Sequence, residues 1–128
     1  MPTATAAARR RALTGPALRT FFRIASAWHL SEAEQMRLLG LHSRASLQAW
    51  KRGKVATLRK DALERISYVL GIYQGLQVLV PTTANTWVHQ PNTAAPFGGL
   101  PAIARMTAGN VGDLYVVRQY VDAPCGWG

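Results

Sequence analysis

The chain has 128 residues, of which 48% are hydrophobic, enough to build one ordinary domain or two small helical units around a shared core. Residues 1–60 carry 12 Lys and Arg against two acids, a net charge of +10, whereas residues 61–128 carry three Arg against four acids, a net charge of −1. This asymmetry favours a polyanion as the partner of the first half and a different partner for the second half. A basic surface that serves only solubility is the alternative.

Two further features of the composition bear on location. No run of 18 apolar residues occurs, so the sequence predicts no membrane-spanning helix. The single cysteine, Cys125, has no partner for an internal disulfide, which favours a reducing cytoplasm. We therefore expect a cytoplasmic protein.

The first fifteen residues differ from the segment that follows them. Residues 1–15 show no apolar periodicity and include a run of three arginines from Arg9, so a disordered basic tail is expected. A helix is predicted to begin at Pro16, because proline is tolerated in the first turn of a helix. From Leu18 to Trp28, apolar residues recur at helical spacing.

Two short helices are predicted next. A capping box from Ser31 to Glu34 predicts a helix over residues 31–39, and Gly40 is a typical residue to end it. Ser43 is placed to cap a further helix that runs to Gly53.

A capped helix, a glycine turn and a second helix rich in basic and polar residues are typical of a helix-turn-helix, which predicts a DNA-binding unit over residues 16–60. On the second helix, Arg44 can fork onto guanine and Gln48 onto adenine, while Lys51 can hold a phosphate. Such units usually read half-sites in pairs, so a homodimer on double-stranded operator DNA is expected. A solvated basic helical hairpin is the alternative. The DNA-binding candidates are Ser43, Arg44, Ser46, Gln48, Lys51, Arg52 and Lys54, with Arg59 and Lys60 adding charge beyond them.

The longest helix is predicted over residues 61–81, where apolar residues step by three and four until a proline ends the pattern. Asp61 and Glu64 resemble an acidic capping box at its start. Gly71 and Gly75 lie four apart, which indicates close packing of another helix. So apolar a helix must be central to the fold or must face a partner, such as a second copy of the chain.

Shorter helices separated by turns are predicted over residues 82–128. One holds Trp87, and Pro101 starts another after a turn-rich stretch. A last helix follows Asn110, which is expected to cap it together with Asp113. The fold class predicted from the whole chain is all-α, with six or seven helices.

No pattern in the sequence indicates catalysis. The histidines, His29, His42 and His89, are far apart, and no Cys-x-x-Cys or His-x-Glu pattern accompanies them. A nucleophile elbow and a glycine-rich phosphate loop are both absent from the sequence. We therefore expect a binding protein and not an enzyme, with no catalytic residues, no metal and no cofactor.

The second half carries an ordered pattern. Its parts are a helix with Trp87, a turn at Pro91–Asn92, a loop at Phe97–Gly98–Gly99, a short helix from Pro101 to Met106, then Gly109 and a last helix from Asn110 to Val121. In this order, and with a helix-turn-helix upstream, residues 16–128 resemble the Xre-type antitoxins of toxin–antitoxin systems whose toxin is a RES-domain protein.

The resemblance implies a function for each half. Residues 82–128 would bind a RES-domain toxin, an NAD-consuming or ADP-ribosylating protein of bacteria, and would neutralise it by covering its active site. The first half would bind operator DNA and repress the operon. Aromatic residues suit such a protein interface. The alternative is a stand-alone helix-turn-helix repressor whose second half dimerises or binds a ligand. The toxin-binding candidates are Trp87, Asn92, Phe97, Pro101, Arg105, Met106, Arg118, Tyr120 and Trp127.

Overall fold

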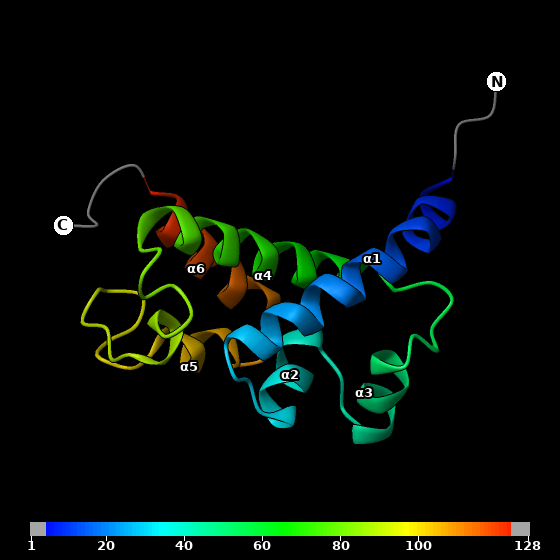
Figure 1. Ribbon diagram of the computed structural model, residues 1–128, viewed down its shortest axis with the longest axis horizontal. Helices are drawn as coiled ribbons and strands as arrows, with labels where there is room; N and C mark the ends of the chain where they lie inside the picture. The colour runs from blue at the N-terminus through cyan, green and yellow to red at the C-terminus, as the bar shows by residue number, and fades with distance from the viewer. Residues whose placement is uncertain (1–4, 124–128) are drawn as a thin grey trace.

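The computed structural model describes residues 5–123, which form six α-helices, one short 3₁₀ helix and no β-strand (Figure 1). The predicted all-α fold class is confirmed. No helix in this part of the chain is long and apolar enough to cross a membrane. In chain order the elements are α1 (Ala6–Ala27), α2 (Glu32–Leu39), α3 (Arg44–Lys51), α4 (Lys60–Leu79), the 3₁₀ helix η1 (Trp87–His89), α5 (Ala102–Met106) and α6 (Val111–Asp122).

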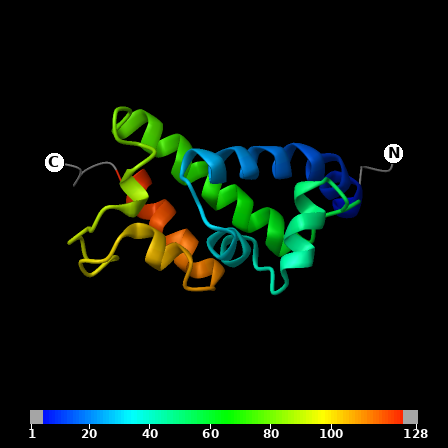
Figure 2. The same ribbon diagram turned by 60° about the horizontal axis from the view of Figure 1, so that its bottom comes forward.

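Helix α4 links the two halves of the molecule. Helices α1 and α2 pack against it from one half, and α6 packs against it from the other (Figures 1 and 2). Helix α3 packs on α1 and α2, and α5 packs on α6 and η1. Buried side chains from both halves belong to one hydrophobic cluster, so the helix-turn-helix unit and the C-terminal region share a single core.

Helix α1 is longer than the sequence analysis indicates. It begins at Ala6, ten residues before the predicted start at Pro16, so the prediction of disorder is wrong for residues 6–15. The hydroxyl of Thr5 caps the helix by accepting a hydrogen bond of 3.0 Å from the N–H of Ala8. Pro16 consequently lies inside the helix and not at its first turn.

Thr14 explains why the helix extends this far. Its buried hydroxyl donates to the carbonyl of Arg10 at 2.6 Å and accepts from the N–H of Leu58 at 2.9 Å. Leu58 is itself buried, in the connection between α3 and α4. The first turns of α1 are therefore attached to a segment 44 residues away in sequence, a contact that local periodicity does not reveal.

The caps of the two short helices are confirmed. Ser31 Oγ accepts from the N–H of Glu34 at 3.1 Å, and the Glu34 carboxylate accepts from the N–H of Ser31 at 2.8 Å. Gly40 has a φ of 73° and ends α2 in the left-handed region that favours glycine. Ser43 caps α3 through the N–H of Ser46.

Two other predicted caps are wrong. Neither α4 nor α6 has a side-chain hydrogen bond at its N-cap: α4 begins at Lys60 with Arg59 as its N-cap, so Asp61 lies inside the helix, and the N-cap of α6 is Asn110. Asp61 instead lies 3.5 Å from Arg59, and Asp113 accepts from Arg105 at 2.8 Å. At the start of α6, the guanidinium of Arg105 therefore takes the carboxylate that the predicted capping pair would use.

Helix α6 crosses α4 at the two predicted glycines. A Cβ atom on Gly71 would overlap the guanidinium of Arg118, and a Cβ atom on Gly75 would overlap Cγ1 of Val121. Both contacts come from α6, so the predicted close packing of a helix at these glycines is confirmed.

We predict that Thr14→Val lowers the free energy of unfolding by about 1–3 kcal/mol, because the buried N–H of Leu58 loses its acceptor. Urea denaturation followed by circular dichroism measures the change. Thr14→Ser keeps the hydroxyl and should lose clearly less. Equal losses in the two variants would show that the hydroxyl contributes nothing.

We also predict that Gly75→Ala destabilises the fold more than Gly71→Ala. Overpacking costs roughly 1–3 kcal/mol and exceeds the gain of about 1 kcal/mol from helix propensity at Gly75, where the buried and stiff Val121 cannot move aside. At Gly71 the obstacle is the flexible end of Arg118, which can swing away. Thermal unfolding measures the stability of both variants.

A double variant checks the cause of the Gly75 effect. Val121→Ala removes the methyl group that a side chain at position 75 would meet, so Gly75→Ala and Val121→Ala together should cost less than the sum of their separate costs. Strict additivity would contradict the packing explanation.

Candidate functional site

The turn between α2 and α3 is held in place from α4. Arg65 donates to the carbonyl of Arg37 at 3.2 Å, near the end of α2, and to the carbonyl of Gly109 at 3.1 Å, before α6. It also lies directly beside Gly40, where a Cβ atom would come within 3.0 Å of its Nε. Arg65 thus ties the helix-turn-helix to the C-terminal region, a role that no sequence pattern indicates.

The two serines at the start of α3 form local hydrogen bonds. Ser43 Oγ accepts from the N–H of Ser46 at 3.0 Å and donates to Ser46 Oγ at 2.9 Å. Ser43 is exposed and Ser46 is half-buried. Both stand at the exposed end of α3 as predicted, and their first role is to begin the helix.

Three of the predicted DNA-binding side chains converge on one carboxylate. Arg44 Nη2 lies 2.9 Å from Glu32 Oε1, Gln48 Nε2 donates to Glu32 Oε2 at 2.6 Å, and Lys51 Nζ lies 3.8 Å from Glu32 Oε2. Residues spaced by four and by three lie on one face of a helix, so this stripe of α3 faces the start of α2. Glu32 was not predicted as part of this site, because its partners lie on a different helix.

Arg52 and Lys54 are placed differently. Both are exposed and flank Gly53 in the turn after α3. No acidic side chain in residues 5–123 forms an ion pair with either of them. Among the predicted cations in residues 5–123, these two and Lys60 are exposed and have no ion pair that a polyanion would have to break.

Helix α1 brings further cations to the same side. A hollow of about 360 Å³ between α1 and the end of α3 is lined by Arg19 and Arg23 of α1 and by Lys51, around a floor that includes Phe22 and Trp50. The two arginines were missed because the apolar periodicity of this helix indicated only a core element. The basic surface therefore includes α1 as well as α3.

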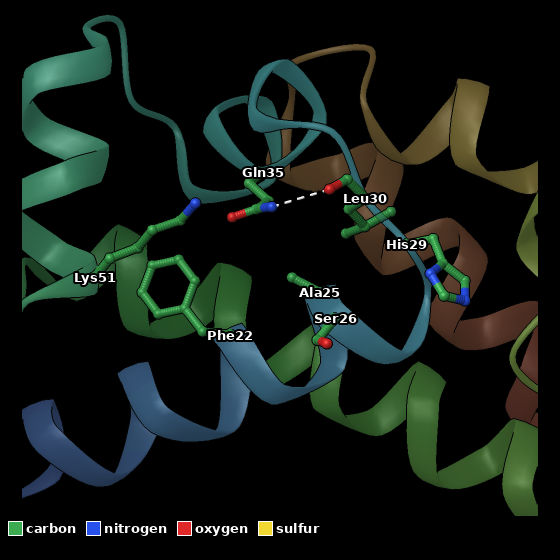
Figure 3. Close-up of a pocket in the computed structure, with 7 residues that line it drawn as sticks. All are labelled: Phe22, Ala25, Ser26, His29, Leu30, Gln35 and Lys51. Atoms are coloured by element: carbon green, nitrogen blue, oxygen red, sulfur yellow. Dashed lines mark hydrogen bonds between the residues drawn. The ribbon is translucent and has the colours of Figure 1, made fainter.

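A second hollow of about 460 Å³ opens between α1, α2 and α3 (Figure 3). Lys51 and Phe22 line one side of it, with Lys51 Nζ 6.0 Å from the centre of the Phe22 ring. On the other side, the Gln35 amide donates to the carbonyl of Leu30 at 3.0 Å. The Gln35 oxygen has no protein partner, but neighbouring atoms cover it completely. A molecule in the hollow would not reach this oxygen, so we assign no ligand there.

Aromatic residues of the C-terminal region pack on one another. Trp87, Phe97 and Tyr120 form a cluster with ring-centre distances of 5.9, 6.3 and 5.1 Å. Phe97 and Met106 are only 5% and 1% exposed, so two residues predicted at a toxin-binding surface lie in the core. Trp87 and Tyr120 are half-buried.

The loop between η1 and α5 is closed by backbone hydrogen bonds. The Asn92 side chain accepts from the N–H of Ala94 at 2.9 Å, and its main chain bonds Gly99 at 2.8 Å and Leu100 at 3.2 Å. Pro101 forms an isolated bridge with Pro91 and begins α5. Asn92 and Pro101 thus shape this loop.

The two arginines predicted to bind a toxin are paired within the chain. Arg105 contacts Asp113 at 2.8 Å and donates to the carbonyl of Pro96 at 3.0 Å. Arg118 contacts Asp122 at 2.7 Å. Both side chains remain about one-third exposed. Trp127, also predicted at this surface, lies outside the described residues.

Two large apolar side chains at the surface of this half are exposed. Leu100 is 61% exposed beside Gly98 and Gly99, and Tyr115 on α6 is 46% exposed. Leu100 was not predicted, and among the aromatic residues type alone does not separate the exposed Tyr115 from the buried Phe97. Separately, the described part of the chain contains no group of three His, Cys, Asp or Glu side chains that could hold a metal ion.

Comparison with known proteins identifies the family. Residues 7–71, which span α1 to α3 and the first part of α4, match the model of the antitoxin Xre-like helix-turn-helix domain. The chain therefore belongs to the Xre-like helix-turn-helix antitoxin family, a family of DNA-binding regulators. The match begins within the first turn of α1, inside the segment that the sequence analysis expected to be disordered.

The chain is also similar to a bacterial protein over most of its length. It is 40% identical over 111 residues to the uncharacterized protein y4oB of Sinorhizobium fredii (strain NBRC 101917 / NGR234). The alignment covers 85% of this chain and 84% of that protein. No solved structure matches the chain.

Proposed function

We propose that the protein is the antitoxin of a type II toxin–antitoxin system in the bacterial cytoplasm. Residues 82–128 bind a RES-domain toxin that consumes NAD or ADP-ribosylates its target, and they neutralise it by covering its active site. The α2–α3 unit binds operator DNA and represses the operon. Membership of the Xre-like antitoxin family is the observation that carries this proposal.

The placement of the cations supports DNA binding by the first half. Arg52 and Lys54 are exposed at the end of α3, and Arg19 and Arg23 line the hollow beside it. Such a cluster suits the phosphates on either side of a groove, while the start of α3 faces the bases. Arg44 then reads guanine and Gln48 reads adenine.

The surface of the second half supports a protein partner. Exposed Leu100 and Tyr115 add apolar area to half-buried Trp87 and Tyr120. Arg118, one-third exposed, adds a charge that an acidic partner can recruit. Aromatic and arginine side chains of this kind dominate the energy of protein interfaces. Buried Phe97 and Met106 support this surface from beneath.

A homodimer fits an apolar groove between α1 and α4. The groove, about 660 Å³ in volume, is lined by Leu13, Leu63 and Leu70 among others, with Lys60 and Glu64 also on its wall. In a two-fold pair the same patch meets itself, so Lys60 can face the partner subunit's Glu64. On α4, where a dimer contact was predicted, α1, α2 and α6 cover other apolar side chains, while Val78 and Leu79 at its end stay 80% and 40% exposed.

We predict that the chain forms a stable complex with the toxin encoded beside it and restores growth that the toxin stops. Co-expression, affinity purification and mass measurement of the complex test this. A chain that lacks residues 122–128 should protect cells less, because the small-residue tail with Trp127 is proposed to enter the toxin cleft. Lys54→Ala, a change in the DNA-binding half, should protect normally and serves as the matched control.

Two results would contradict the toxin-binding role. Normal protection by the truncated chain would remove the tail from the mechanism. If the chain purifies alone and its neighbour is harmless, the stand-alone repressor replaces the antitoxin.

For DNA, we predict that Lys54→Ala weakens binding to every duplex and reduces the slope of log affinity against log salt by about one, since one phosphate contact is lost. Arg44→Ala should instead relax discrimination at one base pair, by roughly 1–3 kcal/mol. Fluorescence anisotropy with labelled duplexes over a range of salt concentrations measures both effects. Arg118→Ala removes the same charge at the far end of the molecule and should leave binding unchanged. A salt-independent affinity of the unaltered protein would exclude DNA as the partner.

A further inference from the structure

One carboxylate contacts three side chains on the polar face of α3. Glu32, the first residue of α2, contacts Arg44, Gln48 and Lys51 at 2.9, 2.6 and 3.8 Å. The Glu32 and Lys51 side chains are each about one-third exposed, whereas Arg44 is 74% exposed. Glu32 itself is well placed, because the positive end of the helix dipole favours an acid in the first turn of a helix.

The contacts leave part of each partner unused. Glu32 takes one of the two N–H groups of Gln48, which leaves the other N–H and the carbonyl for an adenine edge. It takes the Nη2 edge of Arg44, which leaves donors on the remaining guanidinium nitrogens. Base reading by both side chains is therefore compatible with Glu32 staying in place.

Binding of phosphate by Arg44 or Lys51 competes with their contacts to Glu32. For Arg44 or Lys51 to hold a phosphate, its cation has to leave the carboxylate or share it with a second anion. The exchange replaces one charged contact by another, so little is gained, and Glu32 then repels the phosphate nearby. Any duplex offers phosphates, whereas only the right sequence offers the matching base edges.

We propose that Glu32 is a positioning residue that sets the sequence selectivity of DNA binding. It aims Arg44 and Gln48 at bases and withholds the charges of Arg44 and Lys51 from non-specific phosphate contacts. This inference rests on the proposed DNA binding by α3. The observation that supports it is that Glu32 contacts three side chains on one face of α3.

The test compares Glu32→Gln with the unaltered protein on two duplexes. One is selected by the unaltered protein from a random pool, and the other is a scrambled duplex of the same length. Affinity is measured by anisotropy over a range of salt concentrations, after circular dichroism has verified helix content. Asp122→Asn is the matched control, because Asp122 is an exposed acid at the end of α6, far from α3, that also pairs with an arginine and whose replacement changes the net charge equally.

Glu32→Gln should bind the scrambled duplex about tenfold more tightly near 0.1 M salt, with a salt slope steeper by about one to two, since one or two cations become available. The affinity ratio between the selected and scrambled duplexes should fall by a similar factor. Asp122→Asn should leave both the slope and the ratio unchanged. Glu32→Asp keeps the charge but shortens the side chain, and it should lie between the unaltered protein and Glu32→Gln in selectivity.

The outcomes separate this inference from the proposed function. If the unaltered protein binds DNA and Glu32→Gln has the same slope and ratio, the role of Glu32 is refuted while DNA binding stands. Equal effects of Glu32→Gln and Asp122→Asn would show that only the net charge matters and would refute the role of Glu32 as well. If the pool yields no selected duplex and neither protein binds at low salt, the DNA-binding function itself fails.

Discussion

Burial of apolar side chains on several faces of α4 holds the molecule together. Ile66, Val69, Ile72 and Leu76 are all at most 4% exposed, and α1, α2 and α6 together provide the surfaces that cover them. Helix α5 has five residues and α6 has twelve, lengths at which an isolated helix is marginal in water. The C-terminal region therefore depends on α4 for its structure. Because the same helix completes the helix-turn-helix core, the two halves form one cooperative unit.

The charge that is available at the surface depends on ion pairing more than on composition. The formal charge of residues 1–60 suggests a uniformly basic half, but Glu32 compensates the cations at the start and end of α3. The exposed cations without an ion pair in residues 5–123 include Arg52 and Lys54 beside that helix, and Arg19 and Arg23 of α1. A polyanion would thus be attracted to the flanks of α3 while its polar face keeps a defined arrangement. This division matches the general separation of phosphate contacts, which position, from base contacts, which specify.

Much of the fold was predictable because it depends on short-range contacts. The capping box at Ser31, the turn at Gly40 and the cap at Ser43 involve residues at most five apart, and all were predicted. The glycines on α4 also identified the site of close helix packing. The features that were missed join distant segments, as Thr14 does with Leu58 and Arg65 with Gly109, each across 44 residues. The failed cap at Asn110 has the same origin, because Arg105 competes for Asp113 only once α5 and α6 are packed.

The C-terminal region shows why residue type alone does not locate a binding surface. Trp87, Phe97 and Tyr120 suggested an interface because they are aromatic, yet their rings contact one another and hold η1, the following loop and α6 together. That cluster, with the backbone hydrogen bonds from Asn92, fixes a loop in which Leu100 points outward at 61% exposure. Keeping a leucine in water is unfavourable unless another surface covers it, and a rigid loop loses little conformational entropy when that happens. The aromatic cluster therefore holds its exposed neighbours in a fixed shape, and Leu100 is the side chain that this arrangement would present to the proposed partner.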